Sequence, residues 1–507
     1  MLAKVQTLGL FGLDAYPVEI DVDVTRGLPG TAIVGLPDSC LKESRERVRS
    51  GIKNSGLRYP GDKITVSLAP AAVKKEGASF DLPIALGILA ASQQINPHIL
   101  RNFLFAGELA LDGQLRPVRG SLAMAQALSV SKIKNLVLPY ANAQEASFVE
   151  FARIFAFQTL RELLEALAHP ESLVPCRAPS FPAEQITREQ AADFSDVKGQ
   201  FLAKRAFEIA AAGGHNILMI GPPGSGKTML AKRLPSILPD MTTTEAVETT
   251  KIYSALGMTS TLGLITRRPF RAPHHTISDI ALAGGGSIPQ PGEISLAHNG
   301  VLFLDEFPEY HRNVLEILRQ PLEENCIHVS RIRKSVILPA RFLLVAAMNP
   351  CPCGFLTDPH HSCRCHSLQI QKYMGKISGP LLDRIDLHLE LPSVQYRELT
   401  DNREGESSAA IKKRVENIRA LQTERFRADP VYVNAQMTGR HIKAFCVLKK
   451  TAGDLLKKAM TEMGFSARAY DKILKVSRTI ADMAGSECIC EEHLAEAIHY
   501  RCLDRRR

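Results

Sequence analysis

A glycine-rich loop that follows a short apolar run places the strongest constraint on how this chain folds. Residues 216–220 read Asn-Ile-Leu-Met-Ile, residues 221–228 read Gly-Pro-Pro-Gly-Ser-Gly-Lys-Thr, and a run with helical periodicity follows at 229–234. This pattern between a strand and a helix is typical of a phosphate-binding loop, in which backbone N–H groups turn inward on phosphate oxygens. At average residue frequencies, chance produces such a match in roughly two of a hundred chains of this length. The sequence therefore predicts a nucleotide site.

Each residue type in this loop has its own predicted task. Lys227 is expected to reach the β- and γ-phosphate oxygens, and the hydroxyl of Thr228 to ligate Mg²⁺. The other residues predicted to bind the nucleotide are Gly221, Pro222, Pro223, Gly224, Ser225 and Gly226. ATP and Mg²⁺ are accordingly the predicted cofactors.

Polar residues at the ends of two further apolar runs complete the predicted site. Residues 301–304 read Val-Leu-Phe-Leu and are followed directly by Asp305 and Glu306. Behind a phosphate loop, such a pair places Asp305 on Mg²⁺ and Glu306 against the attacking water, whereas the same pair alone is usually a solvated loop. The apolar run 342–347 leads to Asn349, which can orient that water. Runs of this kind suit buried parallel strands.

Composition and patterning divide the whole chain into three folded parts and a connector. With 45% hydrophobic and 23% charged residues, the composition is that of ordinary globular protein. β-like runs such as 17–24 and 63–68 alternate with helical stretches such as 82–92, which predicts an α/β or α+β domain over residues 1–167. The remaining expected parts are a proline-rich linker at 168–190, the nucleotide-binding domain at 191–395 and a helical bundle at 396–507, with helical runs at 412–426, 452–463 and 467–484.

Hydropathy and charge restrict location and partners. No apolar run approaches the roughly 20 residues that span a bilayer, and the N-terminus lacks the residue order of a signal peptide, so we expect a cytoplasmic protein without membrane attachment. The formal net charge of +9 permits nucleic-acid binding through local patches but does not require it.

Four peptides beyond the phosphate loop carry a resemblance to a known family. They are Phe270-Arg-Ala-Pro-His-His275, Asp305-Glu-Phe-Pro-Glu309, Asn349-Pro-Cys-Pro-Cys353 and Gly379-Pro-Leu-Leu-Asp-Arg-Ile-Asp386. With the order of the site motifs, the chain resembles the magnesium-chelatase-like ComM/YifB group of AAA+ ATPases over nearly its whole length. The resemblance implies an N-terminal Lon-protease-like domain (ribosomal protein S5 domain 2-like), a central AAA+ P-loop NTPase domain and a C-terminal helical lid. It does not imply magnesium chelation, because a dedicated chelatase motor needs partner subunits.

The same resemblance assigns roles to two arginines and implies an assembly. Arg384 resembles the finger that reaches the γ-phosphate of a neighbouring subunit, and this resemblance implies a homo-oligomeric ring, which we expect to be a hexamer. Arg468 resembles the sensor 2 residue of the lid, although many helical arginines only cover apolar surface.

Two segments are candidates for contact with DNA. The stretch between the loop and the acidic pair is long enough to hold an insert, and its residues 283–292 are too rich in glycine and proline for a helix interior. Such loops project toward the central pore in relatives, and a surface loop is the alternative. Residues 327–338 predict a basic β-hairpin that resembles the pre-sensor hairpin of ring helicases, or else a solvated edge. The hairpin's cations are Arg331, Arg333 and Lys334.

Four of the eleven cysteines gather in one loop. They are Cys351, Cys353, Cys363 and Cys365, followed by His366. Tetrahedral Zn²⁺ takes four such ligands, so the thiolates are candidate zinc ligands with His366 as a substitute. The Cys-x-Cys spacing is tighter than the common Cys-x₂-Cys, so reduced thiols without metal are the alternative.

The N-terminal part resembles the proteolytic domain of Lon in residues 70–79 and 107–113, with Ser79 in the place of the nucleophile. A Ser–Lys protease needs an amine to take the proton of the serine, and Leu122 occupies the place of that lysine. We therefore expect an inactive domain that contacts DNA or assembles rings. Lys74 and Lys75 are candidate cations for DNA, although such pairs are usually solvated.

Three functional hypotheses follow. The first is a ring-forming ATPase that moves on single-stranded, forked or branched DNA as a helicase or branch-migration motor. The resemblance connects it to natural transformation and homologous recombination, with recombination proteins as further partners. The second is a protein-remodelling motor of the chelatase type. The third, an ATP-dependent protease, is disfavoured by Leu122, and the basic hairpin favours DNA over protein as the substrate.

Overall fold

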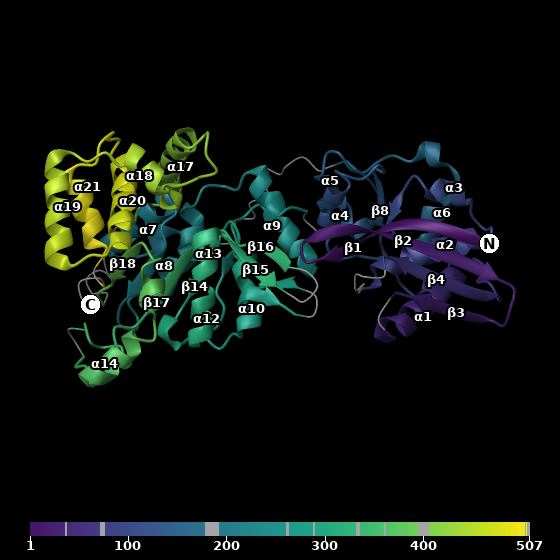
Figure 1. Cartoon of the computed structure of the whole chain (residues 1–507), viewed down its shortest axis with the longest axis horizontal. Helices are drawn as coiled ribbons and strands as arrows, with labels where there is room; N and C mark the ends of the chain where they lie inside the picture. The colour runs from purple at the N-terminus through teal and green to yellow at the C-terminus, as the bar shows by residue number, and fades with distance from the viewer. Residues whose placement is uncertain are drawn as a thin grey trace. The chain divides into compact units, whose positions relative to one another are not determined.

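The computed structural model describes most of the chain, and its contacts divide the chain into two compact units (Figure 1). The described residues are 1–35, 38–70, 77–177, 192–259, 263–286, 289–330, 335–358, 361–393, 405–501 and 503. One unit contains Met1–Gln185, Thr243–Ile265 and Gly286–Pro291, and the other contains Ile186–Thr242, Thr266–Gly285 and Gly292–Arg507. Among the described residues, no helix is both long and apolar enough to cross a membrane.

A mixed seven-stranded sheet forms the core of the first unit. Its strands, in spatial order, are β3 (Gly30–Val34), β4 (Lys63–Ala69), β2 (Asp14–Thr25), β1 (Leu2–Phe11), β5 (Leu104–Phe105), β8 (Asn135–Pro139) and β9 (Arg153–Phe157). β1 and β2 form a long antiparallel hairpin, whereas β5, β8 and β9 run parallel. The predicted β-like runs 17–24 and 63–68 lie in β2 and β4 and are confirmed.

Helices pack on this sheet according to their apolar surfaces. α2 (Asp81–Ala91), predicted at 82–92, is buried along its whole length and packs against β1 and β2. A helix that is apolar all round needs such a buried position. The other elements are α1 (Asp38–Asn54), α3 (Pro97–Leu100), α4 (Ser121–Ala127), α5 (Ala143–Ser147), α6 (Leu160–Ala168), and the small hairpin of β6 (Glu108–Leu109) and β7 (Leu115–Arg116).

One helix of the first unit comes from the middle of the chain. α9 (Thr243–Leu256) follows the phosphate loop in sequence but packs on α4. The backbone carbonyl of Ser254 accepts a hydrogen bond from the N–H of Gly120 (2.8 Å), and its hydroxyl donates to the buried carboxylate of Glu145 (2.9 Å). The insert expected before the acidic strand therefore contributes a helix to the N-terminal unit.

A parallel five-stranded sheet forms the core of the second unit. Its strands, in spatial order, are β11 (Phe270–Arg271), β14 (Val301–Leu304), β17 (Leu343–Met348), β10 (Ile217–Ile220) and β18 (Leu387–Glu390). β10, β14 and β17 are apolar and buried throughout, which confirms the three strands predicted from apolar runs. Because the strands are parallel, the loops after β10, β14 and β17 meet at one edge of the sheet.

Short helices connect these strands. They are α7 (Phe201–Gly213), α8 (Lys227–Arg233), α10 (Asp279–Ala283), α11 (Glu293–Leu296), α12 (Arg312–Ile317), α13 (Arg319–Glu324), α14 (Ser367–Met374) and α15 (Gly379–Leu382). The glycine-rich segment 283–292 begins where α10 ends, and its described residues contain only the short strands β12 (Gly284–Gly285) and β13 (Gln290–Pro291).

The predicted basic hairpin exists as a pair of strands. β15 (Cys326–Ser330) runs antiparallel to β16 (Ser335–Pro339), with Ile327 opposite Leu338. Its tip, residues 331–334, lies outside the described residues, and with it Arg331, Arg333 and Lys334.

The C-terminal part of the second unit is helical, as predicted. It contains α17 (Ser408–Arg425), α18 (Gly439–Phe445), α19 (Lys450–Met463), α20 (Ala467–Met483) and α21 (Glu491–His499). The predicted run 452–463 falls within α19, and the runs 412–426 and 467–484 each extend one residue past the end of a helix, at Phe426 and Ala484. α17 and α20 pack against α7, and their apolar residues join one core with the parallel sheet. Most of the predicted linker 168–190 lies outside the described residues, since α6 ends at Ala168 and residues 178–191 are not described.

Candidate nucleotide site and cysteine cluster

The predicted phosphate loop connects β10 to α8, which begins at Lys227. Gly224 and Gly226 have φ angles of +77° and +86°, a left-handed conformation that side chains with a Cβ rarely adopt. Gly221 has a different reason to be glycine, because a Cβ there would lie 2.7 Å from the carbonyl oxygen of Leu391. The glycines therefore permit a tight turn into the N-terminus of α8, where backbone N–H groups favour an anion.

The ammonium group of Lys227 lies over the loop. Its Nζ donates to the carbonyl oxygens of Gly221 (2.8 Å) and Pro222 (2.9 Å) and lies 3.3 Å from Oδ1 of Asn349. Burial lowers the pKa of Lys227, and the Asp305 carboxylate opposes that shift. The predicted phosphate contact and the predicted water-orienting amide are thus neighbours.

The predicted magnesium ligands also lie together. The hydroxyl of Thr228, in the first turn of α8, donates to Oδ2 of Asp305 at the end of β14 (2.9 Å). The other carboxylate oxygen of Asp305 accepts the backbone N–H of Glu306 (2.9 Å). A hydroxyl and a carboxylate at this separation form the oxygen pair that a P-loop site offers to Mg²⁺.

Glu306 has a partner that the sequence reasoning missed. Its backbone is left-handed (φ +51°), and its Oε2 lies 2.9 Å from Nδ1 of His275, whose ring contacts that of His274 with centroids 4.1 Å apart. The pairing of β11 with β14 places residues after β11 beside those after β14. The Phe270–His275 peptide was identified only as a family signature, but two histidines after a strand were a signal that a polar partner is present.

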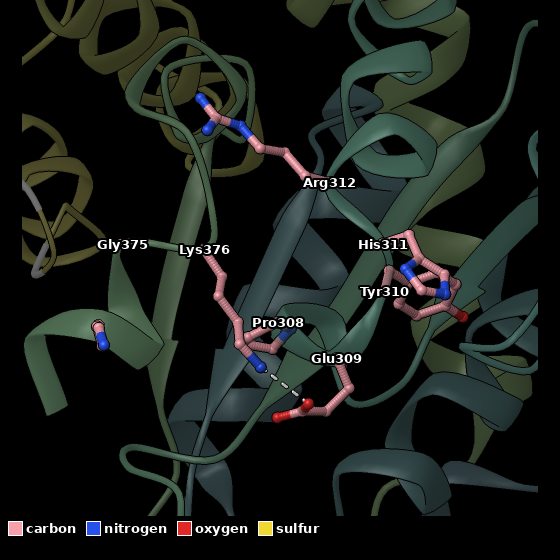
Figure 2. Close-up of a pocket in the computed structure, with 8 residues that line it drawn as sticks. Pro308, Glu309, Tyr310, His311, Arg312, Gly375 and Lys376 are labelled. Carbon is pink, nitrogen blue, oxygen red and sulfur yellow. Dashed lines mark hydrogen bonds and ion pairs between the residues drawn. The ribbon is translucent and has the colours of Figure 1, made fainter. Parts of the chain in front are cut away.

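A surface hollow of about 400 Å³ lies beside the residues that follow the acidic pair (Figure 2). Lys376 reaches across it to Glu309, with 2.9 Å between Nζ and Oε2. Burial raises the pKa of Tyr310. The lining residues are Pro308, Glu309, Tyr310, His311, Arg312, Lys372, Gly375 and Lys376. Cations outnumber anions in this lining, so the hollow suits an anionic group better than an apolar one.

Arg384 and Arg468 both pair with acids of their own subunit. Arg384 follows α15, donates to the carbonyl oxygen of Pro380 (2.6 Å) and pairs with Glu323. It is largely buried and lines a cavity of about 760 Å³. Arg468, in the first turn of α20, is exposed, and its Nη1 lies 3.9 Å from Oδ2 of Asp383.

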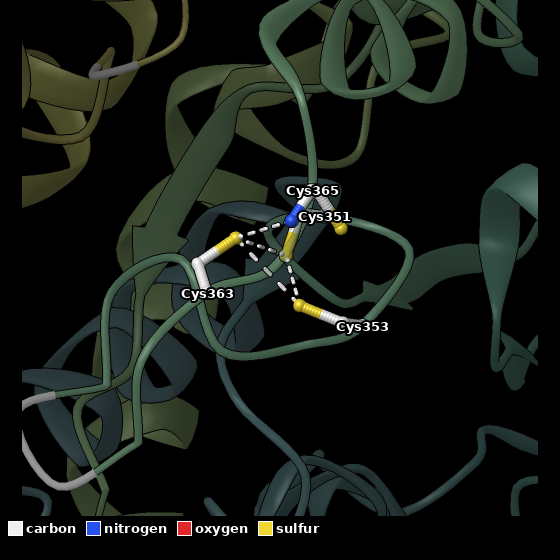
Figure 3. A group of neighbouring side chains, drawn as sticks. All are labelled: Cys351, Cys353, Cys363 and Cys365. Carbon is white, nitrogen blue, oxygen red and sulfur yellow. Dashed lines mark hydrogen bonds between the residues drawn. The ribbon is translucent and has the colours of Figure 1, made fainter.

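The predicted zinc ligands form a compact cluster (Figure 3). The four sulfurs of Cys351, Cys353, Cys363 and Cys365 lie within 4.8 Å of one another, and three of the separations are 3.3, 3.6 and 3.7 Å. With Zn–S bonds of about 2.3 Å, neighbouring sulfurs of a tetrahedral site lie about 3.8 Å apart, so the thiols fit that geometry. His366 immediately precedes α14 and is not one of the four clustered groups.

Two further observations describe the surroundings of the cluster. Hydrogen bonds from the backbone N–H groups of Phe355 and Arg364 lower the pKa of Cys353 to about 6, whereas desolvation and the neighbouring thiols raise the pKa values of Cys363 and Cys365. Within the cluster, Cys353 is therefore the thiol most readily ionised to the thiolate that metals bind. A Cβ on Gly354 would lie 2.8 Å from the ring of Pro223 in the phosphate loop. The cysteine loop therefore packs directly against the nucleotide site.

The predicted place of the Lon lysine is apolar. Leu122 is fully buried in α4 within a cluster that includes Leu8 and Val118. Ser79 lies in a short turn before α2, and Lys74 and Lys75 lie outside the described residues.

Comparisons with known proteins identify the family. Family models of magnesium chelatase subunit ChlI match residues 20–142 and 193–399, and the model of its C-terminal region matches residues 405–501. Competence protein ComM of Haemophilus influenzae is 46% identical over 99% of this chain and 98% of its own length. The chain belongs to the ComM/YifB group of magnesium-chelatase-like AAA+ proteins. This confirms the resemblance carried by the four peptides.

Other members and a more distant relative complete the comparison. YifB of Escherichia coli is 43% identical over 99% of this chain and 98% of its own length. Lon protease 2 of Bacillus subtilis is 28% identical over 134 residues, 26% of this chain, which agrees in part with the Lon-like expectation. The similarity to these two ComM/YifB proteins therefore extends over 99% of the chain.

Proposed function

We propose that this protein is a ring-forming ATPase that uses ATP hydrolysis to move on DNA. The ATPase part rests on two contacts at one edge of the parallel sheet. Lys227 lies within hydrogen-bond distance of Asn349, and Thr228 within hydrogen-bond distance of Asp305. This is the set that a P-loop enzyme needs to bind a nucleotide and position water.

Each residue of the site has a distinct task in this proposal. Lys227 and the loop N–H groups bind the phosphates, and Thr228 and Asp305 hold Mg²⁺, which neutralises charge on the phosphate oxygens when bound. Glu306 accepts the proton of the attacking water, and Asn349 orients that water. The 2.9 Å contact with His275 holds the Glu306 carboxylate beside the site.

The DNA part of the proposal rests on two supports. The Haemophilus relative is named a competence protein, and competence is the capacity of a cell to take up DNA. The segment 331–334, which connects β15 to β16 in sequence, contains three cations, and cations bind the phosphate backbone regardless of base sequence. A hexameric ring, single-stranded, forked or branched DNA, and recombination proteins are the partners we propose, with functional domains at 1–167, 191–395 and 396–507.

The alternative is a chelatase-type motor that remodels proteins without translocating on DNA, which the magnesium-chelatase family match favours. ATP turnover by the purified protein, measured with and without single-stranded, duplex and forked DNA, separates the two. We expect DNA to stimulate turnover. Turnover that is the same with every DNA, together with no DNA binding, would favour the alternative.

Arg384→Ala is expected to leave ATP binding intact and to lower turnover about a thousandfold, because a finger stabilises charge only as the phosphoryl group transfers. Mixing this variant with Lys227→Ala protein should restore part of the activity, since each complete site takes one half from each subunit. Arg427→Ala, which removes an exposed arginine elsewhere, is the control. Verified mixed rings that regain no turnover would contradict an in-trans finger.

The cysteine cluster is proposed to hold one structural zinc ion that stiffens the loop against the phosphate site. Fresh protein should contain about one zinc per chain, and the Cys351→Ser/Cys353→Ser variant should lose it, because two of four ligands are then missing. Cys176→Ser, which changes a thiol of the other unit, should retain the metal. Elemental analysis that finds no zinc in fresh wild-type protein would refute the site.

A further inference from the structure

We infer that Lys472 and Arg501, two cations of the C-terminal helical part, are positioning residues for Arg384. The inference rests on the proposed role of Arg384 as the in-trans finger. The proposed nucleotide chemistry gives neither cation a role. Both contact the turn at 383–386 that carries Arg384.

The first contact is an ion pair with the buried acid of this turn. Nζ of Lys472, on α20, lies 2.7 Å from Oδ1 of Asp386, which is 1% exposed. Oδ2 of Asp386 accepts the backbone N–H of Asn216, just before β10 (2.9 Å), and lies 3.8 Å from Nδ1 of the buried His215. Burial opposes ionisation of Asp386, yet the Lys472 ammonium holds its pKa below the usual value. One carboxylate thus joins the phosphate-loop strand to the lid helix.

The second contact fixes the backbone of the same turn. Arg501 is 1% exposed, and its Nη1 donates to the carbonyl oxygen of Ile385 (2.6 Å). The N–H of His388 donates to the carbonyl oxygen of Tyr500 (2.7 Å), so residues 500–501 run along β18. The side-chain amide of Asn216 adds a longer hydrogen bond to the carbonyl oxygen of Arg384 (3.4 Å). The backbone carbonyl groups of Arg384 and Ile385 therefore accept hydrogen bonds from Asn216, just before β10, and from Arg501 of the C-terminal part.

These contacts matter for the finger because the turn is irregular and has no helix or strand of its own to hold it. Removing Lys472 would leave a buried carboxylate without its cation, which favours a rearrangement of the turn. A displacement of about 1 Å in a catalytic group lowers turnover by as much as about 100-fold. The predicted defect belongs to the neighbouring active site, not to the subunit that carries the substitution.

Because the defect belongs to the neighbouring active site, mixing with subunits that carry an intact finger should restore turnover. A substitution that only damaged the fold of its own subunit would not be rescued in this way. Lys472→Met removes the ammonium group and keeps the apolar stem, and we expect turnover to fall by about 10- to 100-fold with unchanged ATP affinity. When Lys472→Met protein is mixed with Lys227→Ala protein, the Lys227→Ala subunits supply a correctly placed finger to intact phosphate loops. Activity should then recover as far as it does with Arg384→Ala. Lys472→Arg should retain most turnover in pure rings.

Two further variants control for folding. The Asp386→Asn/Lys472→Met double variant removes both charges and with them the cost of an unpaired buried ion, so it should fold and still lose turnover with rescue in trans. Lys458→Met, an exposed lysine of α19, should behave as wild type. If mixing restores turnover to Arg384→Ala protein but to neither Lys472 variant, the positioning role is contradicted while the in-trans finger stands. Full turnover of Lys472→Met protein in pure rings would contradict the positioning role as well. Absence of rescue for Arg384→Ala as well would remove the in-trans finger and this inference with it.

Discussion

Lys227→Ala is expected to abolish nucleotide binding, whereas Glu306→Gln is expected to retain binding and stop hydrolysis. The ammonium group of Lys227 contacts two carbonyl oxygens of the loop. In the proposed site it also binds phosphate in the ground state, so its loss should remove that contact. Glu306 is the proposed general base, and removing such a group lowers turnover by about 100- to 10,000-fold. Equilibrium binding of a labelled nucleotide and steady-state phosphate release measure the two effects separately.

Lys232→Ala provides the control, because Lys232 is an exposed cation at the end of the same helix and should tolerate the change. The two variants should also differ in assembly assays, since only Glu306→Gln can hold ATP in the ring without turning it over. Normal hydrolysis by Glu306→Gln would show that the base has been assigned to the wrong residue. Normal ATP affinity of Lys227→Ala would show the same for the phosphate contact.

Replacement of Arg331, Arg333 and Lys334 by Ala is expected to nearly abolish ATP-driven strand movement while basal hydrolysis persists. In sequence the three residues fall between β15 and β16, and none of them is among the residues proposed to bind the nucleotide. A motor must bind phosphates again after each hydrolysis step, and these cations are the proposed contacts. Each lost phosphate contact should reduce the slope of the logarithm of the binding constant against the logarithm of salt concentration by about 0.7–0.9. Affinity for forked DNA should fall only modestly, because we expect other basic surface patches to contact the DNA as well.

A matched triple variant, in which Arg427, Lys457 and Lys458 become Ala, removes the same charge from exposed positions of the C-terminal part. It should move a labelled four-way junction as wild type does. Unchanged junction movement by the hairpin variant would exclude the hairpin from the mechanism. Loss of basal hydrolysis in that variant would instead indicate that the hairpin supports the fold.

The sheet and the phosphate loop were predictable because their signals are local. The strands β10, β14 and β17 are apolar runs, and a buried parallel strand needs nothing else in its sequence. The cysteine cluster was predictable for a similar reason, since its four ligands lie in one short loop. The family resemblance was confirmed because its peptides are long and specific.

Other features depend on the order of strands or on distant partners. The contact between His275 and Glu306 follows from the pairing of β11 with β14, which no local pattern specifies. The docking of α9 on the N-terminal unit depends on the buried carboxylate of Glu145, far away in sequence. The pairing of Arg384 with Glu323 is equally non-local. These contacts join residues that are far apart in the chain and are set by tertiary packing. Local sequence patterns indicate single elements but not which elements pack together.

Movement of a labelled four-way junction by purified wild-type protein tests the central claim most directly. The proposal predicts branch migration with ATP and Mg²⁺, and none with a non-hydrolysable analogue or with Glu306→Gln protein. The Glu306→Gln protein should still bind the junction, which separates binding from movement. Wild-type protein that hydrolyses ATP but neither binds nor moves forked or branched DNA would contradict the DNA-motor account.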